Sequence, residues 1–188
     1  MLEAGKVDYR AVKATMIEMA YAGSRGENRI VNDGEMACAS AALAASMDNE
    51  GDEKPGEGHL VLSRILMHFC QSSLSPDKEK YVPYVLEKFD IGKLERLQCP
   101  DVAFNVGLIF DYLSRNAQKK SREGRGLYDG LAFQYYKLAN KLWSNSSPHK
   151  KGIQKSLAAV EERLRLTERP KRNSSPPQLV YRDKFECL

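Results

Sequence analysis

The sequence predicts an all-α protein, either an irregular helical bundle or a short α-solenoid of about seven helices, with an extended C-terminal tail. Alanine, leucine, lysine and glutamate abound while β-branched residues are sparse, a composition that favours helices. Apolar residues recur at helical spacing in one segment after another. Short stretches rich in glycine, proline and polar residues separate these segments and mark the turns.

The first 50 residues predict a pair of helices. In residues 7–23, Tyr9, Val12 and Met16 recur at helical spacing and define one apolar face. The second helix, over residues 35–47, is rich in alanine, so neighbouring helices can approach its small side chains closely. We therefore expect this helix to be buried, with small side chains at its contacts.

Residues 48–59, DNEGDEKPGEGH, predict a loop and the main internal boundary. The stretch combines glycine, proline and acidic residues without apolar periodicity. We accordingly divide the chain into an N-terminal helical pair at 1–50, a main helical domain at 51–169 and a tail at 170–188. The tail contains three prolines, so we expect it to be extended or disordered.

The main domain predicts five further helices. They cover residues 59–74, 77–89, 102–120, 128–143 and 144–166. Pro83 should kink or restart the second of them, and Asp101 can cap the third. Ser147 and Pro148 open the last one, in which Ile153 and Leu157 begin an apolar stripe that Val160 and Leu164 continue. Between the third and fourth, SREGRG predicts a flexible basic link.

Two of these helices carry a pattern of small and aromatic residues at matching spacings. The first has Ala103, Val106-Gly107 and Phe110, and the second has Ala132, Tyr136, Ala139 and Pro148. The region 101–165 thereby resembles a tetratricopeptide-type helical hairpin repeat. Gly107 and Ala132 should let the two backbones approach, while Phe110 and Tyr136 fill the remaining space. The resemblance implies an α-solenoid fragment that binds a peptide or partner protein; generic packing in an irregular bundle is the alternative.

No pattern in the sequence indicates catalysis, a metal or a cofactor. There is no GxSxG element, and the glycine-rich stretches lack the lysine-serine ending of a phosphate-binding loop. His68 and Cys70 stand two positions apart on a helix and point to different sides, so a metal site there would need His59 folded back towards Cys70. We expect a non-catalytic protein without a cofactor.

The net charge, the cysteines and the lack of long apolar segments indicate where in the cell the protein acts. The chain of 188 residues has a net charge of +4, well short of the dense positive charge that by itself indicates a nucleic-acid binder. The four cysteines form no CxxC pair, which favours a reducing compartment. The N-terminus does not resemble a secretory signal, and no segment approaches the roughly 20 apolar residues that span a bilayer. We expect a soluble cytoplasmic protein with no membrane partner.

These observations predict an intracellular interaction module or adaptor that binds a peptide or partner protein. Tyr128, Tyr135 and Lys137 are the predicted contact residues. The alternative is an RNA- or DNA-binding protein that uses basic loops in its C-terminal half, in which a homo-oligomer would gather many weak phosphate contacts. Its predicted contacts are Lys119, Lys120, Arg122, Arg125, Lys150, Lys151, Arg169, Lys171 and Arg172. Ser175, which precedes a proline, is a candidate for regulatory phosphorylation.

Overall fold

The computed structural model describes residues 8–24, 33–49, 52–71, 82–117 and 122–168, which form eight helices and no strand. The helices are α1 (Tyr9–Ser24), α2 (Asp33–Ser46), α3 (Glu57–Gln71), α4 (Val82–Lys88), α5 (Ile91–Arg96), α6 (Pro100–Ala117), α7 (Arg122–Leu142) and α8 (Lys150–Glu168). The predicted all-α class is therefore confirmed. The predicted tail at 170–188 lies outside the described residues.

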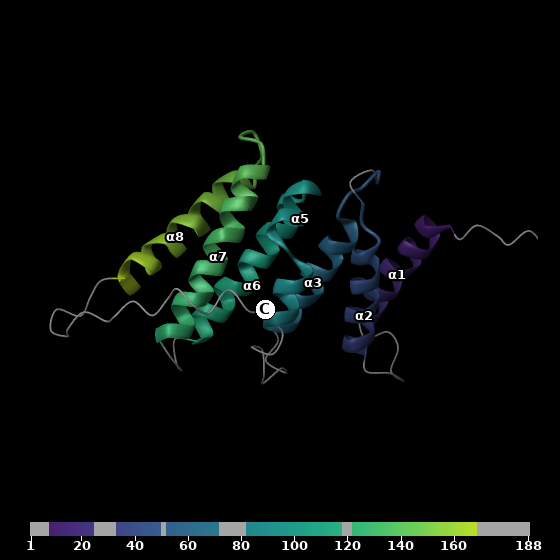
Figure 1. Cartoon of the computed structure of the whole chain (residues 1–188), viewed down its shortest axis with the longest axis horizontal. Helices are drawn as coiled ribbons and strands as arrows, with labels where there is room; N and C mark the ends of the chain where they lie inside the picture. The colour runs from purple at the N-terminus through teal and green to yellow at the C-terminus, as the bar shows by residue number, and fades with distance from the viewer. Residues whose placement is uncertain (1–7, 25–32, 50–51, 72–81, 118–121, 169–188) are drawn as a thin grey trace, which may run out of the picture.

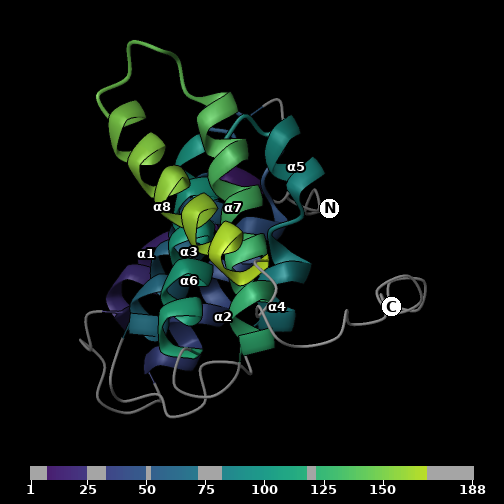
Figure 2. The same cartoon turned by 90° about the vertical axis from the view of Figure 1, so that its left-hand side faces the viewer.

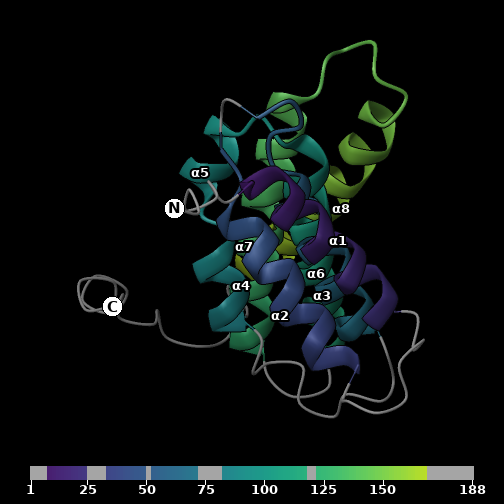
Figure 3. The same cartoon turned by 90° about the vertical axis from the view of Figure 1, so that its right-hand side faces the viewer.

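The six longer helices stack side by side in the order of the chain (Figure 1). The row begins with α1 and α2 at one end, continues through α3 and α6, and finishes with α7 and α8 at the other. Figures 2 and 3 look along this row from its two ends, with α8 near the viewer in the first and α1 and α2 in the second. The short helix α5 packs against α6 and α7.

A single cluster of buried apolar side chains runs through the row, from Ala20 in α1 to Val160 in α8. The cluster includes residues on both sides of the expected boundary at position 50, so the core continues from the N-terminal helical pair into the rest of the chain. In α8, Ile153 and Val160 are fully buried, and the two leucines of the predicted stripe pack against the same core. This stripe was predicted correctly.

The close approach predicted for the alanine-rich helix occurs between α2 and α3. Ala37, Ala41 and Ala44 are fully buried. A Cβ atom on Gly58 of α3 would lie 2.4 Å from the carbonyl carbon and oxygen of Ala44 and 2.5 Å from the nitrogen of Ala45. Contact at this point is therefore between main chains, and only glycine leaves enough space for it.

Helix α7 begins earlier than the sequence predicts. The stretch SREGRG was expected to be a flexible link, but the helix starts at Arg122 and includes all but the first of those residues. Tyr128 and Asp129 are buried, so the helix must already be formed where the chain enters the core. Their packing outweighs the roughly 1 kcal/mol that each glycine of the stretch costs in a helix.

The seam between α6 and α7 is filled by aromatic rings. The ring of Tyr136 lies against Gly107, where a Cβ atom would be 2.5 Å from ring carbon Cδ1. Phe104 contacts the same ring with centroids 5.6 Å apart, and Phe110 stacks on Tyr135 at 5.7 Å. Gly107 thus makes room for a side chain of α7, whereas the sequence suggested room for its backbone.

The substitution Gly107→Ala is expected to lower the free energy of unfolding by about 1–3 kcal/mol, because the added methyl group overlaps a buried ring that cannot move freely. Urea denaturation followed by circular dichroism measures the change. Gly130→Ala is the matched control, since a Cβ atom there meets nothing within 4 Å and should raise stability by up to about 1 kcal/mol. Equal effects of the two substitutions would contradict the packing described here.

Candidate partner-binding cleft

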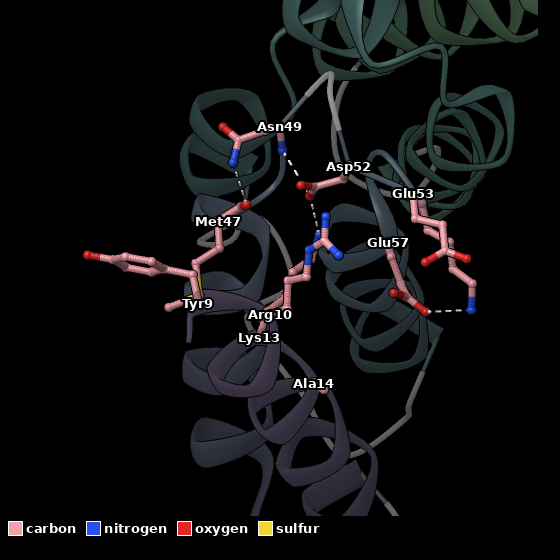
Figure 4. A pocket seen from close by; sticks show the side chains of 10 residues that line it. Tyr9, Arg10, Lys13, Ala14, Met47, Asn49, Asp52, Glu53 and Glu57 are labelled. Carbon is pink, nitrogen blue, oxygen red and sulfur yellow. Dashed lines mark hydrogen bonds and ion pairs between the residues drawn. The ribbon is translucent and has the colours of Figure 1, made fainter. Parts of the chain in front are cut away.

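A cleft of about 240 Å³ opens where the start of α1, the end of α2 and the start of α3 meet (Figure 4). Helix α1 and the segments around α2 and α3 each contribute charged side chains to it. The cleft is lined by Tyr9, Arg10, Lys13, Ala14, Met47, Asn49, Asp52, Glu53, Lys54 and Glu57. It combines apolar surface with both signs of charge, as peptide-binding clefts often do.

Asp48 lies beneath the cleft and joins the three helices that form it. Its side chain is fully buried. It accepts hydrogen bonds from the backbone nitrogens of Gly58 at 3.1 Å and His59 at 2.8 Å, at the start of α3. The His59 ring nitrogen Nδ1 lies 2.5 Å from the same carboxylate, and the Lys13 ammonium reaches it from α1 at 2.5 Å. A carboxylate placed this way caps α3 and offsets the positive end of its dipole.

Hydrogen bonds and ion pairs keep the groups beneath the cleft in their charged forms. Burial disfavours the ionised form of Asp48, but hydrogen bonds from His59, Lys13 and two backbone N–H groups outweigh this and hold its pKa below the usual value. Burial likewise opposes the charge of Lys13, yet its contacts with Asp48 and Asp52 raise the pKa above the usual value. The ammonium is 2.8 Å from Asp52, so it is held between two carboxylates. Lys13 is therefore protonated and unsuited to act as a nucleophile or base.

The rim of the cleft carries groups that are available to a ligand. Tyr9 is 70% exposed and points outward, while Arg10 reaches towards the middle of the cleft (Figure 4). Arg10 and Glu53 are exposed, and their side chains have no hydrogen-bond or ion-pair partner among the described residues. His59 is only 1% exposed and cannot reach a molecule in the cleft. The arrangement is suited to binding charged groups rather than to proton transfer.

The histidine considered for a metal site has a structural role. His59 contacts Asp48 and the ring of Phe89, whose centroid is 6.1 Å away, and does not turn towards Cys70. No group of three or more histidine, cysteine or acidic side chains in the described part of the chain is arranged to hold a metal ion.

The predicted aromatic contact residues are in the core. Tyr135 is 2% exposed, stacks on Phe110 and donates a hydrogen bond to the carbonyl oxygen of Phe89 at 2.7 Å. Burial raises its pKa to about 12. Tyr128 is also buried. The expectation of an exposed aromatic surface at these two positions is therefore wrong, and only Lys137 of that set is exposed.

The predicted basic residues do not form one surface where the structure describes them. Arg125 is half-buried near the start of α7, and its Nε atom is buried without a partner among the described residues. Lys150, beyond the other end of α7, donates to the carbonyl oxygens of Asn140 and Trp143, while Lys151 is exposed. The Arg122 side chain and Lys119, Lys120, Arg169, Lys171, Arg172 and Ser175 lie outside the described residues.

A second buried charge cluster, which the sequence did not indicate, joins α6, α7 and α8. Its members are Asp111, Ser114, Arg115, Asp129 and Arg163. Within α6, Asp111 directly follows buried Phe110, and such a carboxylate inside an apolar run is the only sequence signal for the cluster. For Asp48 there is no comparable signal, because it begins a stretch that reads as a polar loop.

Comparison with known proteins finds no matching family model, no matching curated protein and no matching solved structure. Among the helices described, none combines the length and apolar character needed to cross a membrane. The tetratricopeptide-like repeat remains a prediction from the sequence. What the chain does must therefore be argued from its own geometry.

Proposed function

We propose that this chain is a non-catalytic helical scaffold that binds a peptide segment of a partner protein in the cleft between α1, α2 and α3. The observation that carries the proposal is the cleft itself, whose base holds Lys13 between two carboxylates and whose rim carries charges that are unpaired among the described residues. Arg10 suits an acidic side chain or a terminal carboxylate of a peptide, and Tyr9 offers an exposed ring for stacking.

The row of stacked helices supports the same proposal. In such an array each helix is held mainly by its neighbours, so long faces and the two ends stay accessible to partners. Nucleic-acid binding has less support, because two of the described basic residues predicted for it, Arg125 and Lys150, are half-buried or bonded to main-chain carbonyl oxygens. The four cysteines form no CxxC pair, which fits action in a reducing compartment such as the cytoplasm.

Selection from a displayed random-peptide library, followed by fluorescence anisotropy with the full chain, tests the proposal. We expect the selected peptides to share acidic residues, and Arg10→Ala to weaken their binding at least about tenfold. Because Arg10 is exposed and unpaired among the described residues, the same substitution should change the free energy of unfolding by no more than about 0.5 kcal/mol.

The matched control is Lys137→Ala, which removes another exposed positive charge, this one from α7 and away from the cleft. Binding should not change in this variant. Peptides whose affinity falls with Lys137→Ala but not with Arg10→Ala would place the binding surface on α7 and overturn the proposed cleft. A gel-shift titration with generic RNA and DNA at low salt completes the test, since a shift that weakens steeply with salt would favour the nucleic-acid alternative.

A further inference from the structure

Arg163 links α8 to two buried carboxylates on the neighbouring helices. Its Nε atom donates to Oδ1 of Asp129 in α7 at 2.9 Å, and its Nη2 atom also donates to Oδ1 of Asp111 in α6. The Asp129 side chain is fully buried and that of Asp111 is 6% exposed. The guanidinium of α8 is therefore inserted into the seam between α6 and α7.

The two carboxylates depend on Arg163 to different degrees. Asp111 also binds Arg115, one turn further along the same helix, with Nη2 at 2.5 Å from Oδ2. Besides Arg163, the Asp129 carboxylate contacts only the hydroxyl group of Ser114 among the described residues, at 2.8 Å. Its second oxygen, Oδ2, is buried without a hydrogen-bond partner among the described residues. Without α8, the seam would hold a buried carboxylate whose geometry suits an incoming arginine.

The rest of the α8 interface is shallow. Of its apolar stripe, Ile153 and Val160 are fully buried, while Leu157 is half-buried. Helix α8 closes the row, so among the described helices it has neighbours on one side only. A loop at residues 143–149 connects it to α7 (Figure 2).

We propose that the groove between α6 and α7 is an arginine-anchored helix-binding site that the chain's own α8 fills, and that it exchanges this helix for α8 of a second copy. A second copy presents the same apolar stripe and the same Arg163, so the contacts of that stripe and of Arg163 with α6 and α7 are restored in the exchanged pair. Exchange requires only that the connection at 143–149 open, which makes it an accessible route to a dimer. This site is separate from the cleft at α1 and does not depend on the function proposed for it.

The first test uses a fluorescent peptide of residues 148–168 as the probe and the full chain as the receptor. The wild-type chain should bind it weakly, because its tethered α8 competes at a high effective concentration. The full-length Arg163→Ala variant, whose own helix lacks the anchor, should bind the wild-type peptide at least about tenfold more tightly. A peptide carrying Arg163→Ala should bind the variant chain at least about tenfold more weakly than the wild-type peptide does.

Thermal unfolding distinguishes a binding site from a merely structural ion pair. The wild-type peptide should raise the unfolding midpoint of the Arg163→Ala chain, whereas the altered peptide should not. If Arg163→Ala does not fold, the full-length variant Leu157→Ala replaces it, because it loosens α8 and leaves the charge cluster intact. Binding of the wild-type peptide that is no tighter to the loosened chain than to the wild-type chain would overturn the proposal.

Light scattering tests directly whether two copies of the chain exchange α8. The wild-type chain, concentrated and warmed to just below its unfolding midpoint, should form a dimer, and an excess of the 148–168 peptide should reduce the dimer fraction. A chain that stays monomeric under these conditions, or a dimer that the peptide does not affect, would rule out exchange of α8 between copies.

Discussion

The substitution Gly58→Ala is expected to lower the free energy of unfolding by at least about 3 kcal/mol. Helix propensity alone predicts the opposite sign, since alanine is more favourable than glycine in a helix by about 1 kcal/mol. The added Cβ atom, however, would lie 2.4 Å from main-chain atoms of Ala44, and a backbone cannot move aside as a side chain can. Separating α2 from α3 would also stretch the hydrogen bond between the Gly58 nitrogen and Asp48.

Urea denaturation of the two proteins measures this effect, and Gly152→Ala is the matched control. Gly152 is the third residue of α8, and a Cβ atom there meets nothing within 4 Å. Its replacement should be neutral or stabilising by up to about 1 kcal/mol. If Gly58→Ala proved as well tolerated as the control, the main-chain contact between α2 and α3 would be wrong.

The substitution Asp48→Asn is expected to destabilise the chain by about 3 kcal/mol at neutral pH. Asparagine has nearly the same shape, so the effect isolates the charge. Its loss deprives the Lys13 ammonium of a fully buried counter-ion and weakens the cap on α3. Chemical denaturation at pH 7 gives the magnitude, and Asn49→Ala serves as a control because that neighbouring side chain is exposed.

The pH dependence of stability in the same variant tests whether the loss of the Asp48 charge causes the destabilisation. Because the pKa of Asp48 is lowered on folding, its contribution to stability is present above the usual value of 3.8 and is lost as the pH falls through the folded value. Wild-type stability should therefore decrease more steeply in acid than that of Asp48→Asn. The difference between the two proteins should shrink as the pH falls below the usual carboxyl value of 3.8. A constant difference below that value would show that Asp48 acts through shape rather than charge.

Local pattern was sufficient to predict most helices, because each longer helix buries a stripe with helical periodicity. The stripe of α8 illustrates this, since Ile153 and Val160 fall on one face and both are buried. The small residues of α2 likewise indicated close packing before the partner helix was known. In these cases, residues that recur at helical spacing in the sequence lie on the face of the helix that packs against its neighbours.

Two features of the structure could not be predicted from the spacing of residues within one segment. Asp48, Lys13 and His59 come from three segments, and only the tertiary fold brings them within hydrogen-bond distance. Tyr135 and Tyr136 are adjacent in sequence and so point about 100° apart on the helix, yet both are buried. Helix α7 is covered by α5, α6 and α8 over a wide arc, which no single stripe in its sequence reveals.

The stacking of helices in chain order also bears on how the protein folds and opens. Most contacts between helices join segments that are close in the sequence, so little chain entropy is lost in forming each one. Such a topology folds rapidly and permits nucleation at one pair of helices, with growth in both directions along the row. Transient opening in the native state should begin at the two ends, and amide hydrogens of α1 and α8 should exchange with solvent before those of α6 and α7.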